Sequence, residues 1–304
     1  MADTDYESLD KSFGYLVSAA ANVEKIWSGG IWTEGPAYFP AHKSLVWSDI
    51  PNNRMMRYDE TNGEVGVFRH QSNFANGNAI DRQGRLISCE QGSRRITRTE
   101  YNGDVSVLVD NYKGKKFNSP NDVVIKSDDT IWFTDPAYGI ETDFEGFRAE
   151  SEIGSDNVYR LDPNTGECQV VADDFKRPNG LAFSADETKL YIADSGGWRF
   201  PENPHHIRTF DVSPENTLSG GEVFAECTNG VFDGFRLDAL GHIWTSAQDG
   251  VHCYHPSGQL LGKILVPEGV SNLTFGGERN NRLYITATSS IYTVMLRVKG
   301  QALF

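Results

Sequence analysis

The sequence predicts an all-β fold, namely a six-bladed β-propeller of four-stranded antiparallel blades. Six segments begin with a polar, oxygen-bearing side chain, usually followed by a small residue and then a short apolar run. They recur at intervals of 39 to 58 residues, and each interval has room for four short strands. Repeats of this length and strand content are typical of propeller blades. The six leading residues are Glu34, Asn76, Asn121, Asn179, Asp233 and Asn272.

Each unit shows the same order of elements. The first strand is the apolar run behind the leading residue, and a turn then leads to a second strand such as Lys43–Asp49. A third strand follows, as in Asn53–Asp59, and a fourth, as in Gly103–Val109. The dipeptides Asn62-Gly63 and Asn102-Gly103 are strong hairpin signals and place the turns between strands.

The sixth unit lacks its last strand, because the chain ends soon after the run Ile291–Leu296. We expect the N-terminal segment of about residues 21–30 to supply that strand and to close the ring. Residues 1–304 would then form a single propeller domain. A β-sandwich is the main competing fold, and the regular period argues against it.

Composition limits the classes of partner. The chain has 304 residues, of which 23% are charged and 38% hydrophobic, and its formal net charge is −14. Basic residues are too few and scattered for a nucleic-acid groove, and an anionic membrane surface would repel the protein. We therefore expect a small-molecule partner, no nucleic acid and no membrane, and the oligomeric state stays open.

The N-terminus and the cysteines bear on the compartment. No basic start followed by an apolar core is present, so a cytoplasmic location is expected, or a periplasmic one if a leader has been removed. The four cysteines are widely separated and form no Cys-x-x-Cys pair. This favours free thiols in a reducing compartment over a zinc or redox motif.

The symmetry of a propeller would bring the six leading residues to one axis. Two carboxylates and four amide oxygens would then converge, which suits a hard divalent cation such as calcium, magnesium or manganese better than zinc. A simpler interpretation remains open at each position, because asparagine or aspartate before glycine is also favoured in turns.

Strand direction places the loops between second and third strands around the same point. Two of these loops are unusually long, at 138–156 and 195–206, and we interpret them as walls of a central pocket. Side chains near such loops either face the pocket or bond within turns: Glu90, Asp135, Tyr138 and Gln248. The tryptophans that alternate with polar residues are expected in the core: Trp32, Trp47, Trp132 and Trp244. His205 and His206 are interpreted as structural or loop histidines.

Several motifs resemble the gluconolactonase family, which includes regucalcin, also called senescence marker protein. They occur in order from Trp32 to Gly277: Trp32-Thr33-Glu34-Gly35-Pro36, Ser119-Pro120-Asn121-Asp122, Arg177-Pro178-Asn179-Gly180-Leu181-Ala182-Phe183-Ser184, Asp233-Gly234 and Ser271-Asn272-Leu273-Thr274-Phe275-Gly276-Gly277. The resemblance implies a six-bladed propeller with a divalent metal at its centre.

The resemblance also implies roles for individual residues. Glu34, Asn179 and Asp233 match the metal ligands, Asn121 matches a further ligand or a substrate-contacting amide, and Asp233 matches the general base. The ion expected is calcium, with magnesium, manganese, zinc or iron as alternatives.

Five residues are candidates for substrate binding: Asn76, Ser119, Asn121, Tyr138 and Asn272. Ser119 stands where animal members carry an arginine that contacts substrate. The loop Thr134-Asp135-Pro136-Ala137-Tyr138-Gly139 is more similar to the bacterial sugar-lactonase branch.

The resulting hypothesis is metal-dependent hydrolysis of a sugar lactone, similar to gluconolactone, to its aldonic acid. The metal would polarise the carbonyl while Asp233 takes a proton from the attacking water, or Asp233 would attack the carbonyl itself. The alternatives are an organophosphate or ester hydrolase on the same scaffold, a non-enzymatic binding propeller, and a strictosidine-synthase-like propeller without the metal.

Overall fold

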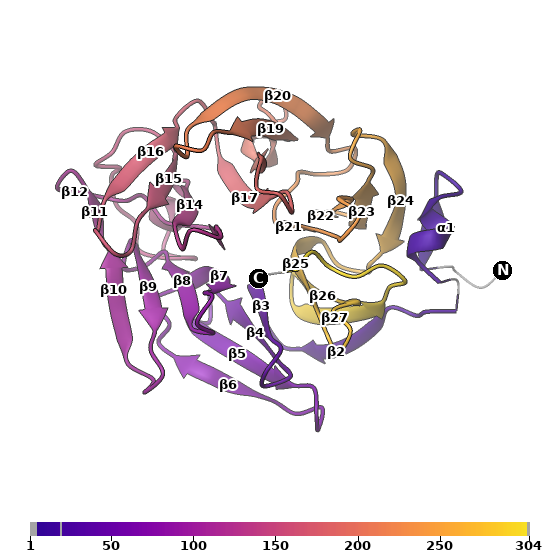
Figure 1. The fold of residues 1–304 in the computed structure, drawn as a ribbon. Coiled ribbons are helices and arrows are strands. Elements are labelled where there is room, and N and C mark those ends of the chain that lie inside the picture. Colours follow the sequence, from indigo (N-terminus) through magenta and orange to yellow (C-terminus); the bar gives the residue numbers. More distant parts are fainter. Residues whose placement is uncertain (1–4, 19, 303–304) are drawn as a thin grey trace.

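The computed structural model describes residues 5–18 and 20–302 and shows six antiparallel sheets arranged in a ring (Figure 1). The predicted six-bladed propeller of four-stranded blades is therefore confirmed. The first strands of successive blades contact one another around the centre, and the fourth strands lie outermost (Figure 1). This arrangement places the first strands around the axis of the ring.

The strands of the first three blades follow one another along the chain: β3 (Thr33–Phe39), β4 (Ser44–Asp49), β5 (Arg54–Asp59) and β6 (Val65–His70); β7 (Ala75–Ile80), β8 (Leu86–Glu90), β9 (Arg95–Thr99) and β10 (Val105–Val109); β13 (Val123–Ile125), β14 (Ile131–Asp135), β15 (Asn157–Leu161) and β16 (Cys168–Ala172). The fourth and fifth blades continue the pattern: β17 (Pro178–Phe183), β18 (Lys189–Asp194), β19 (His206–Val212) and β20 (Leu218–Glu226); β21 (Phe235–Leu237), β22 (Ile243–Ala247), β23 (Gly250–Tyr254) and β24 (Leu260–Leu265).

The sixth blade combines both ends of the chain. Its inner strands are β25 (Val270–Gly276), β26 (Arg282–Ala287) and β27 (Ser290–Met295), and its outermost strand is β2 (Glu24–Ser28). The β2 strand pairs antiparallel with β27, so hydrogen bonds between N-terminal and C-terminal segments close the ring.

Several short strands and a helix lie outside the four-stranded pattern of the six blades. Strand β1 (Tyr6–Ser8) adds to the outer edge of the fifth blade, and a hairpin of β11 (Asn111–Tyr112) and β12 (Lys115–Lys116) follows β10. A helix α1 (Phe13–Leu16) lies outside the ring (Figure 1). None of the helices in the described part of the chain has the length and apolarity to cross a membrane.

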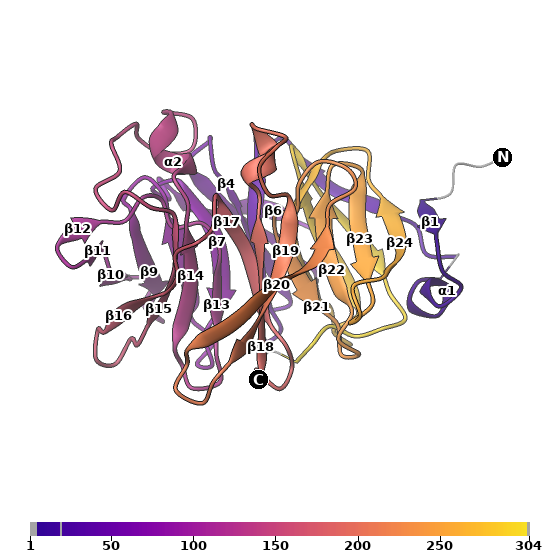
Figure 2. The same ribbon diagram turned by 90° about the horizontal axis from the view of Figure 1, so that it is seen from above.

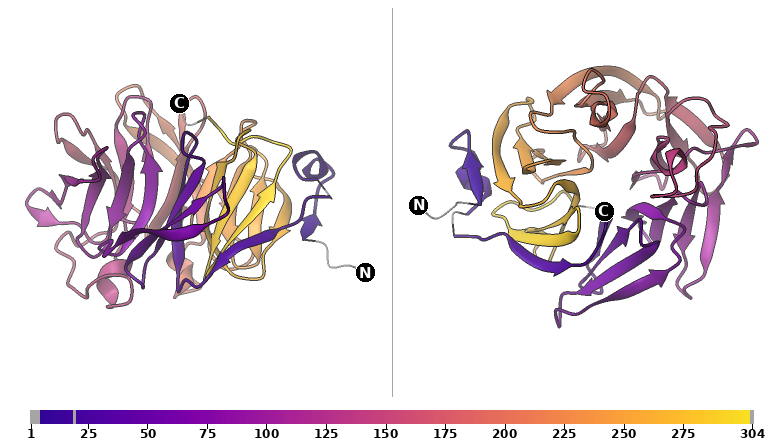
Figure 3. Two further views of the ribbon diagram at one scale, coloured as in Figure 1. Left: turned by 90° about the horizontal axis from the view of Figure 1, so that it is seen from below. Right: turned by 180° about the vertical axis from the view of Figure 1, so that it is seen from behind.

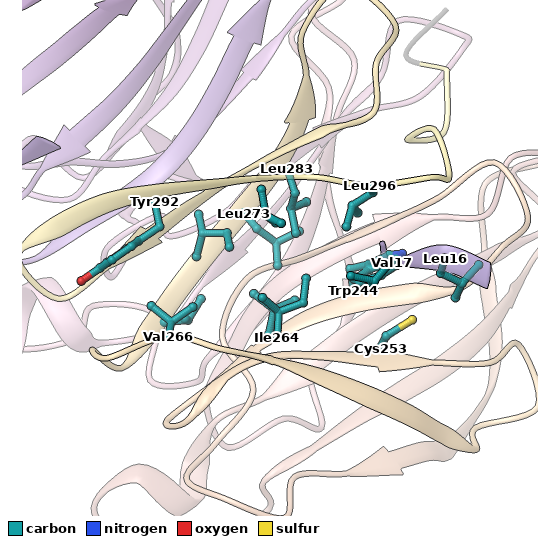
Figure 4. Packing of buried hydrophobic residues seen from close by; sticks show 14 of the residues in the cluster. Leu16, Val17, Trp244, Cys253, Ile264, Val266, Leu273, Leu283, Tyr292 and Leu296 are labelled. Atoms are coloured by element: carbon teal, nitrogen blue, oxygen red, sulfur yellow. The ribbon is translucent and has the colours of Figure 1, made fainter. Parts of the chain in front are cut away.

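The core lies between the blades. Figure 4 shows the largest such cluster, in which Leu16 and Val17 pack with Trp244 of the fifth blade and Leu283 of the sixth. Trp47, Trp132 and Trp244 have no exposed surface, as expected from their alternation with polar residues. Burying aromatic and aliphatic surface between sheets is the dominant stabilising term, at about 25 cal/mol per Å².

The two sides of the ring differ. Helix α2 (Tyr138–Glu141) and the short helix η1 (Gly196–Trp198) belong to the two long loops. Helix α2 rises above one side, whereas the described C-terminal end lies on the other (Figure 2). Figure 3, right, shows the ring from the side that carries the loops.

Candidate metal centre and active site

Five of the six leading residues line one cavity of about 260 Å³ on the side of the ring that carries the two long loops. Glu34, Asn76 and Asn179 lie at the beginnings of β3, β7 and β17, and Asn121 and Asp233 shortly precede β13 and β21. The repeat therefore brings together residues that lie up to two hundred positions apart in the sequence.

The glycines behind the leading residues allow the inner strands to approach closely. The Gly77 N–H donates to the Asn121 carbonyl at 2.7 Å, and the Gly180 N–H donates to the Asp233 carbonyl at 3.1 Å. A Cβ at Gly77 or Gly180 would lie 2.4 or 2.2 Å from the same carbonyl oxygens. Asn76 and Asn179 lie in strands, so close packing rather than a turn explains the glycine that follows each of them.

Asn272, the sixth leading residue, does not line the cavity. Its Nδ2 donates to Glu34 Oε2 at 3.0 Å, while its Oδ1 accepts the N–H of Leu273 at 2.8 Å. The Gly35 N–H also donates to Glu34 Oε2. Asn272 is thus placed to orient the Glu34 carboxylate from behind.

Three buried acceptor atoms in this cavity have no hydrogen-bond partner: Glu34 Oε1, Asn76 Oδ1 and Asn179 Oδ1. Asn78, two residues beyond Asn76, shows the contrasting case. Its Nδ2 donates to the Gly35 carbonyl at 2.9 Å, and its Oδ1 accepts from Ser88 Oγ at 2.6 Å. An unsatisfied buried acceptor costs about 1–3 kcal/mol, and only a donor or a cation can satisfy an acceptor.

The charges in the cavity also favour a cation. Burial raises the pKa of Glu34 and of Asp233, and neighbouring carboxylates raise both further, Glu34 being one of those that act on Asp233. Asp122, fully buried nearby, contributes to both shifts and lies 3.7 Å from the Arg236 guanidinium. A divalent cation among these groups would stabilise both carboxylates in their ionised form.

The donor set fits a hard cation. Within residues 5–18 and 20–302 no group of three or more His, Cys, Asp and Glu side chains is arranged to hold a metal. A metal here would therefore need amide oxygens beside the two carboxylates of Glu34 and Asp233. Carboxylate and amide oxygens are the ligands that calcium and magnesium accept.

The two long loops form walls of the cavity, as expected. We call residues 138–156 the third-blade loop and residues 195–205 the fourth-blade loop. Their lining residues are Tyr138, Thr142, Phe144 and Glu145 in the former and Ser195, Trp198 and Arg199 in the latter. The length of the two loops indicated these segments in the sequence. Because the loops have no repeating pattern, the sequence could not single out Phe144, Glu145, Trp198 or Arg199.

Two further cavity residues come from outside these loops. Trp32 lines the cavity, so the expectation that it packs in the core with the other three tryptophans was wrong. It lies just ahead of β3, outside the alternating strand pattern that buries Trp47. Gln248 also lines the cavity, which agrees with the first of its two expected placements, facing the pocket rather than bonding within a turn.

The remaining candidates near the loops bond within the protein and do not line the cavity. Ser119 Oγ donates to the Pro136 carbonyl at 2.5 Å and accepts from the Gly139 N–H at 2.9 Å, so it supports the start of the third-blade loop. The Asp135 carboxylate accepts the N–H groups of Asn118 and Ser119, both at 2.8 Å.

Glu90 and the two histidines are likewise outside the cavity. Glu90 is ion-paired with Arg95 at 2.7 Å and accepts from Thr97 Oγ1 at 3.1 Å. His206 is the first residue of β19, and His205 Nδ1 lies 3.3 Å from the Asn203 carbonyl. The interpretation of these histidines as loop or structural residues agrees with this placement.

Comparison with known proteins shows which family the chain belongs to. Residues 32–289 match the model of the SMP-30/Gluconolactonase/LRE-like region. The chain is 31% identical to the gluconolactonase of Zymomonas mobilis over 94% of this chain and 84% of that protein. It is 29% identical to the pentonolactonase of Haloferax volcanii over 83% of this chain and 80% of that protein.

A solved structure supports the same relationship. The gluconolactonase of Xanthomonas campestris superimposes with a TM-score of 0.89 at 36% identity, covering 96% of this chain and 94% of that one. Fold and sequence agree along nearly the whole length. This chain therefore belongs to the SMP-30/gluconolactonase/LRE-like family.

Proposed function

We propose that this protein hydrolyses a sugar lactone to its aldonic acid with the help of one divalent cation. The observation that carries the proposal is the convergence of unpartnered oxygens from Glu34, Asn76 and Asn179 beside the Asp233 carboxylate. The lactonase relatives support the reaction class, and the cavity offers space for a small ring.

Four residues would hold the cation: Glu34, Asn121, Asn179 and Asp233. Calcium is the ion that a site of two carboxylates and neutral amide oxygens favours, with magnesium or manganese next. When bound, such a cation supplies a Lewis acid for the lactone carbonyl oxygen. Asn272 holds Glu34 Oε2 in place, which leaves Glu34 Oε1 for the site.

In this proposal Asp233 acts as the general base. One of its carboxylate oxygens takes a proton from water, and the water oxygen bonds to the carbonyl carbon. The bond between that carbon and the ring oxygen then breaks, and the ring oxygen leaves as a hydroxyl after receiving the proton from Asp233. A base of this kind typically contributes about 10²–10⁴-fold to the rate.

Substrate hydroxyl groups would meet neutral polar side chains. Asn76, Asn121, Tyr138 and Gln248 line the cavity and can each donate a hydrogen bond. Burial and the Asp233 charge raise the pKa of Tyr138, so its phenol keeps its proton and stays a donor. Ser119 and Asn272 would act indirectly, through the third-blade loop and through Glu34.

The test is hydrolysis of a lactone panel and a phosphotriester by purified protein before chelation, after chelation and after cation is restored. We expect lactone hydrolysis that chelation abolishes and a divalent ion restores. Glu34→Gln should need more cation for half-maximal activity, whereas Glu150→Gln, on the exposed surface of the third-blade loop, should not.

Two outcomes would contradict the proposal. Full activity of exhaustively demetallated protein would rule out the cation. Turnover of the phosphotriester without turnover of any lactone would replace the lactonase by another hydrolase on this scaffold.

A further inference from the structure

A charged network joins the two long loops. Glu141, the last residue of α2 in the third-blade loop, contacts two arginines. One carboxylate oxygen pairs with Arg177, and the other lies 2.7 Å from Arg199 of the fourth-blade loop. A single side chain therefore connects both loops.

Arg177 is the fixed end of this network. It directly precedes β17, the strand that carries Asn179. Besides Glu141, its guanidinium pairs with Asp156 at the far end of the third-blade loop and lies 5.7 Å from the centre of the Tyr138 ring. Three contacts thus fasten the third-blade loop to the fourth blade.

Arg199 is the weaker end. Its side chain is 53% exposed, against 28% for Arg177 and 21% for Glu141. The Glu141 oxygen that it approaches lacks an aligned hydrogen bond, so this contact is an ion pair alone. Solvent screens such exposed pairs, and each shifts an equilibrium by at most about fivefold.

The network bears on the site because it joins two residues of the cavity lining, Arg199 directly and Tyr138 through Arg177. Tyr138 and Arg199 line the cavity, whereas Glu141 is not part of its lining. With both loops in place the cavity measures about 260 Å³. This lies below the range of about 300–1,000 Å³ that is typical for drug-sized ligands, and suits a single sugar ring.

We propose that Glu141 is a clasp that holds the third-blade and fourth-blade loops as one unit, and that the clasped loops restrict the substrate to a lactone of one sugar ring. Glu141 is a positioning residue, since it acts through Arg199 and Arg177. The size restriction rests on the proposed lactonase function, whereas the joint behaviour of the loops does not.

Hydrogen–deuterium exchange tests the clasp without any substrate. The variants are Glu141→Gln and Arg199→Met, and the control is Glu150→Gln, an exposed glutamate of the third-blade loop. We expect Arg199→Met to accelerate exchange in residues 138–156 as well as in its own loop, by about two- to fivefold. Faster exchange in the fourth-blade loop alone would overturn the clasp.

Kinetics test the size restriction. The ratio of kcat/KM for glucono-δ-lactone to that for a lactone made from a disaccharide should fall by about fivefold in Glu141→Gln and change little in Glu150→Gln. The kcat for the single-ring lactone should hold at saturating cation while its KM rises. A merely structural role would lower kcat/KM for both substrates by the same factor and leave the ratio unchanged. That result would overturn the size restriction.

The two tests separate the possible failures. If the unmodified protein hydrolyses no lactone, the proposed function fails and the size restriction fails with it, while exchange still decides whether Glu141 joins the loops. If lactones are hydrolysed and Arg199→Met affects only its own loop, the function stands and the clasp is wrong.

Discussion

The two sides of the ring hold cavities of different composition, each lined by residues in or next to the six first strands. On the loop-bearing side the cavity of about 260 Å³ presents carboxylates and unpartnered amide oxygens. On the other side a larger cavity of about 380 Å³ has a mixed lining. Apolar residues such as Ile80 and Phe275 lie there beside charged ones such as Asp186 and Arg236. The Gln301 backbone, held by the Leu237 carbonyl at 3.0 Å, brings the C-terminal segment to that cavity.

This comparison teaches that cavity volume alone does not identify the candidate binding site. A polar leading residue lies in or just before each first strand on the side of the long loops, and mostly apolar residues follow it toward the other side. Buried acceptors without partners call for a ligand. Among the described residues the smaller cavity has three of them, on Glu34, Asn76 and Asn179, whereas the larger one has a single such atom, Gln301 Oε1. The smaller cavity is therefore the candidate site, and the predictions below test whether the two cavities are as independent as their chemistry indicates.

The largest expected effect is on Asp233. Asp233→Asn should lower kcat at least about a hundredfold at saturating cation, because the amide keeps an oxygen for the cation but cannot accept a proton. Glu34→Gln should instead be partly rescued by excess cation, since Glu34 has no proton-transfer role. Near-normal kcat in Asp233→Asn would move the base to Glu145, another carboxylate that lines the cavity.

A glycine at the centre of the ring should come next. Gly180→Ala would place Cβ 2.2 Å from the Asp233 carbonyl oxygen, so the backbone at Asp233 must shift. Overpacking of this kind costs about 1–3 kcal/mol in the free energy of unfolding, and activity should fall with it. Urea denaturation measures the loss. The control is Gly66→Ala in strand β6, where no atom outside the adjacent residues lies within 4 Å of the added Cβ. Because nothing is crowded there, stability and activity should not fall for that reason.

Closure of the ring should matter for stability but not for catalysis. Glu268 accepts hydrogen bonds from Ser289, Ser290 and Tyr292 and pairs with Lys25 of β2. Burial alone would raise the pKa of Glu268, but these hydrogen bonds outweigh it and lower the pKa to about 2. Glu268→Gln should therefore cost about 1 kcal/mol at neutral pH, with kcat unchanged.

The pH dependence gives this prediction its sign. Because the folded pKa lies below the ordinary value of 4.5, the stabilisation is complete above about pH 4.5 and disappears as the pH falls toward 2. Denaturation should show that the difference in the free energy of unfolding between the unmodified protein and Glu268→Gln is smaller at pH 3 than at pH 7. An equal difference at both pH values would contradict the role of the ionised carboxylate.

The smallest effect is expected in the larger cavity. Ile125→Val, a change in the lining of the larger cavity, should cost about 0.5 kcal/mol of stability and leave both kcat and cation affinity unaltered. Calorimetric titration with calcium and a lactone assay would check both. A loss of activity approaching that of Asp233→Asn would show that the two cavities are coupled.

The repeat in the sequence was sufficient to predict the fold and to indicate most of the central residues. Glu34, Asn76, Asn121, Asn179 and Asp233 stand at equivalent positions of successive units, so symmetry alone brings them together. The alternation that buries Trp47, Trp132 and Trp244 could be read from the same pattern. It failed for Trp32, which lies outside a strand.

What the tertiary structure alone decided is how side chains from different blades meet. Asn272 lies behind Glu34 because the sixth and first blades adjoin when the ring closes, and no local pattern records that contact. The link from Glu141 to Arg199 joins two loops without periodicity. Local sequence fixes the period of strands and turns, whereas contacts across blades depend on ring closure and on the packing of loops, which only the folded chain specifies.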